Sequence, residues 1–147
     1  MKITIAGASG FVGRALTRTL LEKGHDITGV GTSRVHPMQA MPTFSWISAD
    51  TSRPGAWQAA VESADAVVNL TGRSIFKRWT RTYKERIVES RLKTTENIVS
   101  AMTGSKQALV STSAIGYYGS RGDETLTEVS TPGDDFLARL AVNWEHA

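Results

Sequence analysis

The sequence predicts an α/β fold in which a doubly wound parallel sheet carries helices on both faces. Three observations lead to this prediction. Short apolar runs alternate with segments of helical periodicity along the 147 residues. The connections are mostly short, as in repeated strand–helix units. The predicted strands are short and apolar, as expected when both faces of a sheet are covered. Right-handed crossovers then predict the strand order 3-2-1-4-5.

Five strands are expected at the short apolar runs, over residues 2–6, 26–31, 44–48, 65–70 and 108–112. Four helices are expected between and after them, over residues 11–23, 54–62, 80–102 and from 136 to the end. Residues 32–43, which include Pro37 and Pro42, and residues 116–133 are expected to form loops.

Capping residues and periodicity set the helix boundaries. Gly24 is expected to stop the first helix, and Pro54 suits the first turn of the second. Thr80 is expected to cap the third. The stripes expected to face inward are Val88, Leu92, Val99 and Met102 on the third helix, and Phe136, Leu137, Leu140, Ala141 and Trp144 on the last.

Length and composition fit one globular domain over residues 1–147. The last predicted helix reaches Ala147 without a glycine or proline stop, so we interpret the chain as part of a longer protein. The chain has no cysteine, so disulfides and thiolate metal sites are excluded. The three histidines are scattered, and no metal site is expected. No apolar run approaches the roughly 20 residues that span a bilayer. We therefore expect a cytoplasmic protein without membrane partners.

The net charge of +3 comes mostly from residues 73–93. A basic stretch of this kind binds nucleic acid, forms a solvated helix face, or attracts an anionic cofactor or substrate. No nucleic-acid motif accompanies the charge, so nucleic acid is not the expected partner.

Three glycines, Gly7, Gly10 and Gly13, stand between the first strand and the first helix. In a Rossmann-type fold the first glycine allows the tight turn, the second lets backbone amides approach a pyrophosphate, and the third lets the helix pack on the sheet. The helix N-terminus adds a partial positive charge beside the phosphates. We expect Ser9, Phe11 and Val12 to complete this cofactor-binding loop. The alternative is a set of turn glycines without a ligand.

Residues at the end of the second strand determine whether such a site prefers NAD or NADP. An acidic residue about 20 positions beyond the glycine motif would hold the ribose hydroxyls of NAD. That region has no acid and contains Ser33 and Arg34. Arg34 can pair with a 2′-phosphate while Ser33 donates a hydrogen bond. NADP is therefore favoured over NAD, and the alternative is that Arg34 is an ordinary exposed loop residue.

Four segments resemble a known family: Ile5 to Gly13, Val68 to Gly72, Arg78 to Thr80, and Ser111 to Gly119. The chain resembles the extended and atypical short-chain dehydrogenase/reductases. It is most similar to a divergent subgroup labelled nucleoside-diphosphate-sugar epimerase-like proteins or "cell-division inhibitor" homologues.

The resemblance implies roles for residues at three strand ends. Asp50 matches the acid that contacts the adenine amino group, and Ser113 matches the hydroxyl that polarises the substrate oxygen. Asn69, Leu70, Thr71 and Gly72 match the loop that lies beside the cofactor. The alternatives are a turn or cap role for Asp50 and a hydrogen bond to backbone for Ser113.

The sequence departs from the family at the catalytic pair. Typical members use a Tyr-x-x-x-Lys pair about 25 residues after the serine, but no tyrosine follows Tyr118 and no lysine follows Lys106. Tyr117 or Tyr118 is a candidate lining residue of the substrate site, with Arg121 as a cationic neighbour of Tyr117. Structural packing is the alternative role of both tyrosines.

Two functions follow from these observations. The first is the NADP(H)-binding domain of an oxidoreductase or nucleotide-sugar epimerase-like enzyme, with a nucleotide sugar or carbonyl compound as substrate. The resemblance implies a further C-terminal substrate domain. The second is a non-catalytic NADP(H) sensor. The oligomeric state stays open, and a homodimer through the helix from Thr80 is one expectation, because related folds often dimerise there.

Overall fold

A computed structural model describes residues 1–36, 38 and 40–147. The expected loop position of Pro37 lies outside the described residues. The chain forms two compact units, Met1–Ser111 and Thr112–Ala147. The first unit holds the sheet with three helices, and the second holds a short 3₁₀ turn and one helix.

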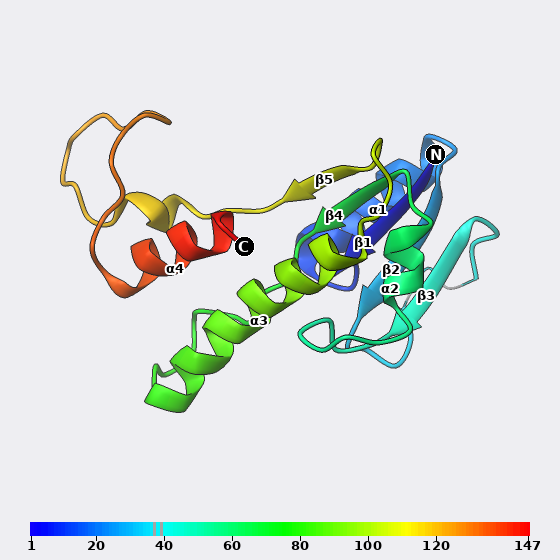
Figure 1. The fold of residues 1–147 in the computed structure, drawn as a ribbon, viewed down its shortest axis with the longest axis horizontal. Helices are drawn as coiled ribbons and strands as arrows, with labels where there is room; N and C mark the ends of the chain where they lie inside the picture. The colour runs from blue at the N-terminus through cyan, green and yellow to red at the C-terminus, as the bar shows by residue number, and fades with distance from the viewer. Residues whose placement is uncertain (37, 39) are drawn as a thin grey trace. The chain divides into compact units, whose positions relative to one another are not determined.

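The first unit is built on a parallel five-stranded sheet (Figure 1). Its strands are β1 (Lys2–Ala6), β2 (Asp26–Gly31), β3 (Phe44–Ser48), β4 (Ala66–Asn69) and β5 (Ala108–Ser111). They lie in the order β3-β2-β1-β4-β5, and every neighbouring pair is parallel. This confirms the predicted topology. The carboxyl ends of all five strands therefore meet at one edge of the sheet.

One face of the sheet packs against α1 (Phe11–Glu22). Ile5 and Ile27 are buried there with Leu21 of the helix. Residues with the opposite side-chain direction along the strands, such as Val30 and Val67, are buried on the other face. Burial on both faces agrees with the short, largely apolar strands of the sequence.

The second face is covered by α2 (Gln58–Glu62) and α3 (Arg81–Ala101). Ile98 of α3 and Val61 of α2 are fully buried against the strands. The buried Thr4 of β1 donates its hydroxyl to the carbonyl of Ala60 at 2.8 Å, so its polar atom is satisfied inside the core.

The prediction that Pro54 opens a helix was wrong, because α2 begins at Gln58. Hydrogen bonds that involve side chains hold the residues between Arg53 and Gln58 in turns. The Trp57 indole donates to the Arg53 carbonyl at 2.9 Å, and the Gln58 side chain accepts from the Gly55 amide at 3.0 Å. Gly55 also favours a turn over a helix at this position.

The predicted inward stripe of α3 was correct only in part, because Val88, Leu92 and Met102 are half-buried and Met102 packs against the apolar core on this face. The helix buries Ile87, Thr94, Thr95 and Ile98, whereas Val99 is 45% exposed. Two of the four buried side chains are threonines, so an apolar stripe is a poor guide to this face. Their hydroxyls bond to residues at the strand ends, as described below. Thr80 caps the helix as expected, accepting the Tyr83 amide at 3.2 Å.

The second unit contains a 3₁₀ turn, η1 (Ile115–Tyr118), and α4 (Phe136–Glu145). The Asp135 side chain caps α4 by accepting the Ala138 amide at 2.9 Å. The buried face of α4 includes the predicted Leu140, Ala141 and Trp144, together with Ala138. Phe136 and Leu137 are half-buried.

Within the described part of the chain, none of the helices has the length and apolar character required to cross a membrane.

The contrast between Ile98 and Val99 gives a test of how α3 packs. Ile98→Ala removes a fully buried side chain, and we expect it to lower the free energy of unfolding by about 2–5 kcal/mol. The matched Val99→Ala removes a side chain that is 45% exposed and is expected to change it by no more than about 0.5 kcal/mol. Urea denaturation measures both values. Equal losses for the two variants would contradict the helix orientation.

Candidate functional site

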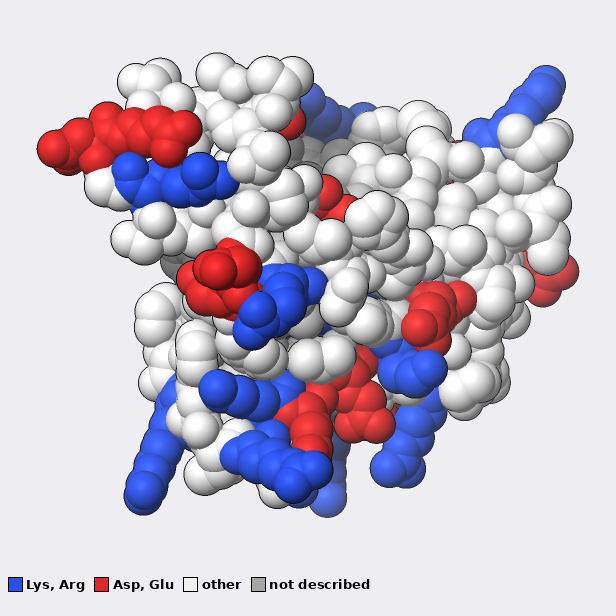
Figure 2. Space-filling model, turned by 60° about the vertical axis from the view of Figure 1, so that its left-hand side comes forward, with Lys and Arg blue, Asp and Glu red and all other residues white. Residues whose placement is uncertain are grey.

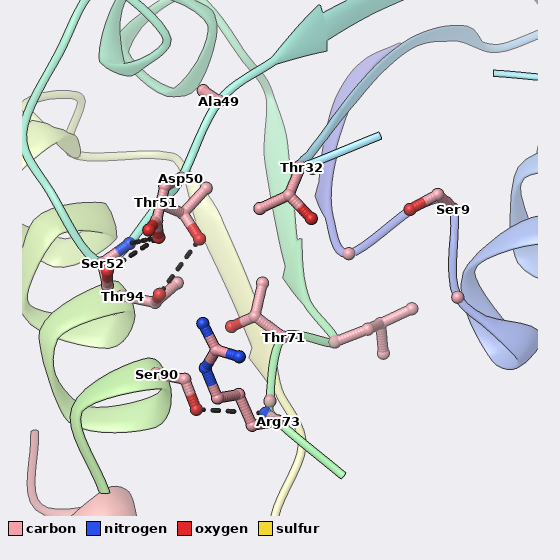
Figure 3. Close-up of a pocket in the computed structure, with 15 residues that line it drawn as sticks. Ser9, Thr32, Ala49, Asp50, Thr51, Ser52, Thr71, Arg73, Ser90 and Thr94 are labelled. Atoms are coloured by element: carbon pink, nitrogen blue, oxygen red, sulfur yellow. Dashed lines mark hydrogen bonds between the residues drawn. The ribbon is translucent and has the colours of Figure 1, made fainter. Parts of the chain in front are cut away.

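A cleft of about 300 Å³ opens at the carboxyl ends of the strands in the first unit (Figure 3). The glycine loop, the ends of β2, β3 and β4, and α3 form its walls. The predicted site residues that line it are Gly7, Ser9, Gly10, Asp50, Leu70, Thr71 and Gly72. The structure thus brings together residues from three strand ends that are far apart in the sequence.

Two of the three glycines in the loop pass so close to neighbouring backbone that a side chain has no room. Gly7 has a positive φ of 86°, and a Cβ there would lie 2.8 Å from the carbonyl oxygen of Leu70. A Cβ on Gly13 would lie 2.3 Å from the oxygen of Gly7. Gly10 is less confined, since its Cβ would lie 3.2 Å from that same oxygen. Gly7 and Gly13 are therefore required by the fold, whereas a methyl group at Gly10 is a tight fit that needs only a small shift of the Gly7 carbonyl.

The first turn of α1 presents free amide hydrogens. Gly10 is the N-cap residue, has extended backbone and supplies no side-chain cap. The first helical bond runs from the Arg14 amide to the Gly10 carbonyl at 3.0 Å, so the preceding amides cannot bond within the helix. Phe11 and Val12 are 89% and 58% exposed. Such a helix terminus suits an anion.

Ser33 and Arg34, just beyond β2, are exposed and are not among the residues that line the cleft. The Ser33 carbonyl accepts the Trp46 indole N–H at 3.1 Å, which holds the turn against β3. Arg34 therefore projects from an anchored turn beside the cleft. Its expected contact with a 2′-phosphate stays a prediction.

His36 ties the same loop to the glycine motif, a role that the sequence did not signal. The ring is buried, with Nε2 3.1 Å from the carbonyl oxygen of Ala8. The Met38 amide donates to Nδ1 at 3.2 Å, so Nδ1 is the acceptor and Nε2 carries the hydrogen. The neutral imidazole thus links the segment after β2 to the glycine loop.

Asp50 lies in the cleft wall at the end of β3. Its Oδ1 accepts the Ser52 hydroxyl at 2.7 Å and the Ser52 amide at 3.1 Å. The Ser52 hydroxyl bond lowers the pKa of this carboxyl; partial burial opposes the shift, and the charges of Arg53 and Arg73 add to it. Asp50 thus holds a turn and also presents an ionised acceptor to the cleft.

A buried hydrogen-bond network supports the loop after β4. The fully buried Asn69 donates to the Thr95 hydroxyl at 3.0 Å and to the Ser111 hydroxyl at 3.4 Å. Its Oδ1 accepts the Thr71 amide at 3.2 Å and the Thr71 hydroxyl at 2.6 Å. The side chain therefore joins β4, β5 and α3 and fixes the course of the loop. It also explains one of the two buried threonines of α3.

The other buried threonine reaches the end of β3. The hydroxyls of Thr94 and Thr51 are 3.0 Å apart, and the Asn97 side chain donates to the Thr51 carbonyl at 3.0 Å. Figure 3 shows Thr51 and Thr94 facing each other across the cleft wall. Helix α3 thus holds the ends of β3 and β4 through hydroxyl groups.

Arg91 of α3 anchors the next part of the loop. Its Nη1 donates to the carbonyls of Arg73 and Ile87, both at 3.2 Å. A Cβ on Gly72 would lie 2.9 Å from the guanidinium carbon of Arg91, so only glycine fits beside it. Burial lowers the pKa of Arg91 from its ordinary value.

The basic stretch of residues 73–93 is interrupted by acids. Arg81 pairs with Glu85 at 3.3 Å and Lys93 with Glu96 at 2.8 Å, both on exposed positions of α3. Figure 2 shows lysine and arginine interspersed with aspartate and glutamate on the face that it presents. This part of the stretch is a solvated helix face of mixed charge.

The candidate catalytic residues Ser113, Tyr117 and Tyr118 lie together in the second unit. With Glu128 and Glu145 they line a cavity of about 510 Å³. The Ser113 hydroxyl donates to the Glu145 carboxylate, a partner that the sequence analysis missed. The two tyrosine rings contact each other edge to face, with centroids 5.2 Å apart.

Arg121 bonds to groups of the loop before α4, and its expected place beside the Tyr117 phenol stays a prediction. Its guanidinium donates to the carbonyls of Tyr118 at 3.2 Å and Thr131 at 2.8 Å, and lies 3.6 Å from Glu124. Arg121 therefore braces the loop that precedes α4. Among the described residues, no cluster of three or more histidine, aspartate or glutamate side chains is arranged to hold a metal ion.

Asn69 gives a stability test of the buried network. Asn69→Ala leaves the Thr95 hydroxyl and the Thr71 amide without this partner, and we expect the free energy of unfolding to fall by about 1–3 kcal/mol. The matched Ser111→Ala removes only the longer 3.4 Å contact and should have a smaller effect. Urea denaturation compares the two. A value for Asn69→Ala within about 0.5 kcal/mol of the unchanged protein would contradict the network's role.

Comparison with known proteins places this geometry in a family. Residues 3–138 match the family described as "NAD dependent epimerase/dehydratase family". The chain is 32% identical over 150 residues to the chloroplastic epimerase family protein SDR39U1 homolog of Arabidopsis thaliana, covering 99% of this chain and 43% of the relative.

Two solved structures share the fold. Human epimerase family protein SDR39U1 (isoform 2), solved with NADPH, has a TM-score of 0.74 and 29% identity over 99% of this chain and 48% of that one. UDP-glucuronic acid 4-epimerase from Bacillus cereus, in complex with UDP-glucuronic acid and NAD, has a TM-score of 0.84 over 99% of this chain and 50% of that one. At 19% sequence identity, the similarity to this second structure concerns the fold alone.

The chain spans about half the length of these proteins. The match extends over most of the present sequence and confirms the resemblance drawn from the glycine loop and the strand ends. The chain belongs to the NAD dependent epimerase/dehydratase family.

Proposed function

We propose that the chain is the NADP(H)-binding part of an oxidoreductase or nucleotide-sugar epimerase-like enzyme. The observation that carries this proposal is the glycine loop. Gly7 and Gly13 have no room for a side chain, and the uncapped first turn of α1 offers amide donors beside a cleft of about 300 Å³. A diphosphate can approach those amides closely, and the helix N-terminus favours its charge.

The remaining walls of the cleft suit an adenosine. Gly31 and Thr32 at the end of β2 are small residues that line the cleft, and Figure 3 shows Thr32 across from Thr71 of the loop after β4. Asp50 presents an ionised carboxylate that can accept a hydrogen bond from the adenine amino group. The Asn69 network holds the loop of Leu70 to Gly72 in place beside the ligand.

NADP is the proposed cofactor in preference to NAD. No acid occupies the end of β2, where Gly31 is followed by Thr32, Ser33 and Arg34. Arg34 is exposed on a turn anchored through Trp46, and its guanidinium is suited to a 2′-phosphate. The human relative in the comparison was solved with NADPH, which supports this choice.

Ser113 and the tyrosines are the proposed contacts to the substrate oxygen. The bound nicotinamide supplies the hydride acceptor or donor. Because Glu145 accepts the Ser113 hydrogen, the Ser113 oxygen keeps its lone pairs available to a substrate hydroxyl. Tyr117 and Tyr118 line the same cavity as Ser113. The proposed substrates are nucleotide sugars or carbonyl compounds, and a further substrate domain and a homodimer stay predictions.

A second candidate, an NADP(H) sensor without catalysis, is favoured by one observation. The Tyr-x-x-x-Lys pair is absent from the chain, since no tyrosine follows Tyr118 and no lysine follows Lys106. NADPH consumption by the full-length protein across a panel of carbonyl compounds and nucleotide sugars separates the candidates. Turnover supports the enzyme, whereas tight binding without turnover supports the sensor.

Substitution of Arg34 tests the cofactor preference. The protein should bind NADPH more tightly than NADH, and NADPH at 100 times its dissociation constant should stabilise the fold by about 2.7 kcal/mol. Arg34→Ala should weaken NADPH binding by about tenfold and leave NADH unchanged, because only NADPH carries the 2′-phosphate. Calorimetric titration measures both. Arg18→Ala, which removes an exposed charge on the same unit, is the control. Equal losses for both dinucleotides would contradict the role of Arg34.

Substitution of Gly10 tests the diphosphate site. A Cβ there meets only the Gly7 oxygen at 3.2 Å, so Gly10→Ala should still fold. The added methyl group stands where the diphosphate approaches, and we expect affinity for both dinucleotides to fall by at least about tenfold. Gly55→Ala, whose Cβ makes an ordinary 3.5 Å contact with Trp57, is the matched control. Unchanged affinity in a folded Gly10→Ala protein would remove the loop from the binding site.

A further inference from the structure

We propose that Arg73 binds the adenine base of the cofactor by stacking its guanidinium on the face of the ring, while the carboxylate of Asp50 contacts the edge of the same ring. This inference rests on the proposed function, because it assigns a residue to the same dinucleotide cleft. Neither the glycine motif nor the end of β2 points to Arg73.

Arg73 stands where two cavities adjoin. It lines the cleft of about 300 Å³ and also a polar cavity of about 380 Å³ that includes Arg53 and Arg86. Asp50, Ser52 and Ser90 line both cavities as well. In Figure 3 the guanidinium of Arg73 extends from the loop after β4 into the space between Thr71 and Thr94. The group therefore lies within the cleft, on the side away from the glycine loop.

The backbone of Arg73 is fixed, whereas its charged group is not engaged. The Arg73 amide donates to the Ser90 hydroxyl at 3.1 Å, and its carbonyl accepts from Arg91 at 3.2 Å. Over the described residues, the structure gives the Arg73 guanidinium no hydrogen bond and no ion pair. The residue is exposed, and its charge lowers the pKa of Asp50. An anchored backbone with an unengaged planar cation is suited to close on a ligand.

The chemistry of the other lining residues assigns the base to this group. The face of a purine can be stacked by the planar group of an aromatic ring or of a guanidinium. None of the described residues that line the cleft is aromatic; apart from Asp50 and Arg73 they are glycine, alanine, leucine, serine and threonine. Arg73 is thus the group in the cleft able to stack on the base. Asp50 complements it as an acceptor for the amino group at the ring edge.

In this arrangement the glycine loop, Arg34 and Arg73 each bind a different part of the dinucleotide. The glycine loop receives the diphosphate, and Arg34 at the end of β2 receives the 2′-phosphate. Arg73 comes from the loop after β4, beside Asp50, and takes the base that all adenine dinucleotides share. Loss of Arg73 must then weaken NADPH and NADH alike, whereas loss of Arg34 separates them.

The experiment measures dissociation constants of the full-length protein for NADPH, NADH and ADP by calorimetry. The variants are Arg73→Ala, Arg73→Lys and the control Arg81→Ala, which removes a charge from an exposed residue paired with Glu85. We expect Arg73→Ala to weaken all three ligands by a similar factor of about tenfold, the size of a lost stacking contact. Arg73→Lys should recover little of the loss, because an ammonium keeps the charge but has no plane to stack. Arg81→Ala should be unchanged.

Three results would overturn the assignment while leaving the proposed function intact. These are unchanged affinity in Arg73→Ala, wild-type affinity in Arg73→Lys, and a loss confined to NADPH. The second would mean that charge alone matters, and the third that Arg73 contacts the 2′-phosphate. If the unchanged protein bound none of the three ligands, the proposed function itself would fail. Melting temperatures of the unliganded variants check that binding differences do not arise from unfolding.

Discussion

The close approach of the glycine loop to its own chain is the constraint on which the site depends. The Gly7 backbone turns with a φ of 86° against the Leu70 carbonyl, and the start of α1 packs so near that a Cβ on Gly13 would be 2.3 Å from the Gly7 oxygen. A side chain at Gly13 would push the helix away from the loop, and one at Gly7 would collide with the backbone of Leu70 after β4. Because the helix stays close, its first amides face the edge where the parallel strands end. The cleft between the strand ends follows from this contact.

Helix α3 secures the other side of the cleft through polar contacts. Its buried threonines bond to Thr51 and Asn69, and its Arg91 holds the loop at Arg73. Hydroxyl and amide groups that are fully bonded in a dry interior restrict geometry more tightly than apolar packing, since a shift of the helix would leave buried donors unpaired. The polar face of α3 therefore positions the loops after β3 and β4, and its apolar residues, Ile87 and Ile98, hold it on the sheet.

The second unit lacks the tyrosine–lysine pair that typical family members use for acid–base chemistry. The structure brings Ser113, the two tyrosines and Glu145 around one cavity, with the serine hydroxyl bonded to the glutamate. A carboxylate accepts hydrogen bonds and protons but cannot lower a neighbouring tyrosine pKa as a lysine does. Chemistry at this cavity would thus differ from that of typical family members. Arg121, the cation nearest in sequence to the two tyrosines, is engaged with the loop before α4.

Local patterns were enough to predict the glycine loop, the Thr80 cap and the start of α4, because each depends mainly on neighbours in the sequence. The strand order followed from the handedness of strand–helix crossovers. Patterns failed where contacts between distant segments decide the outcome. The turn at Pro54 is held by hydrogen bonds of the Trp57 and Gln58 side chains. The buried face of α3 includes threonines because their hydroxyls bond to Thr51 after β3 and Asn69 of β4. Only the tertiary structure showed the roles of His36, Arg73 and Arg91 around the cleft of the first unit, and of Glu145 in the cavity of the second. A polar or charged residue carries no periodic signal of its own, and only the folded chain shows which partner lies within reach of its hydrogen bonds.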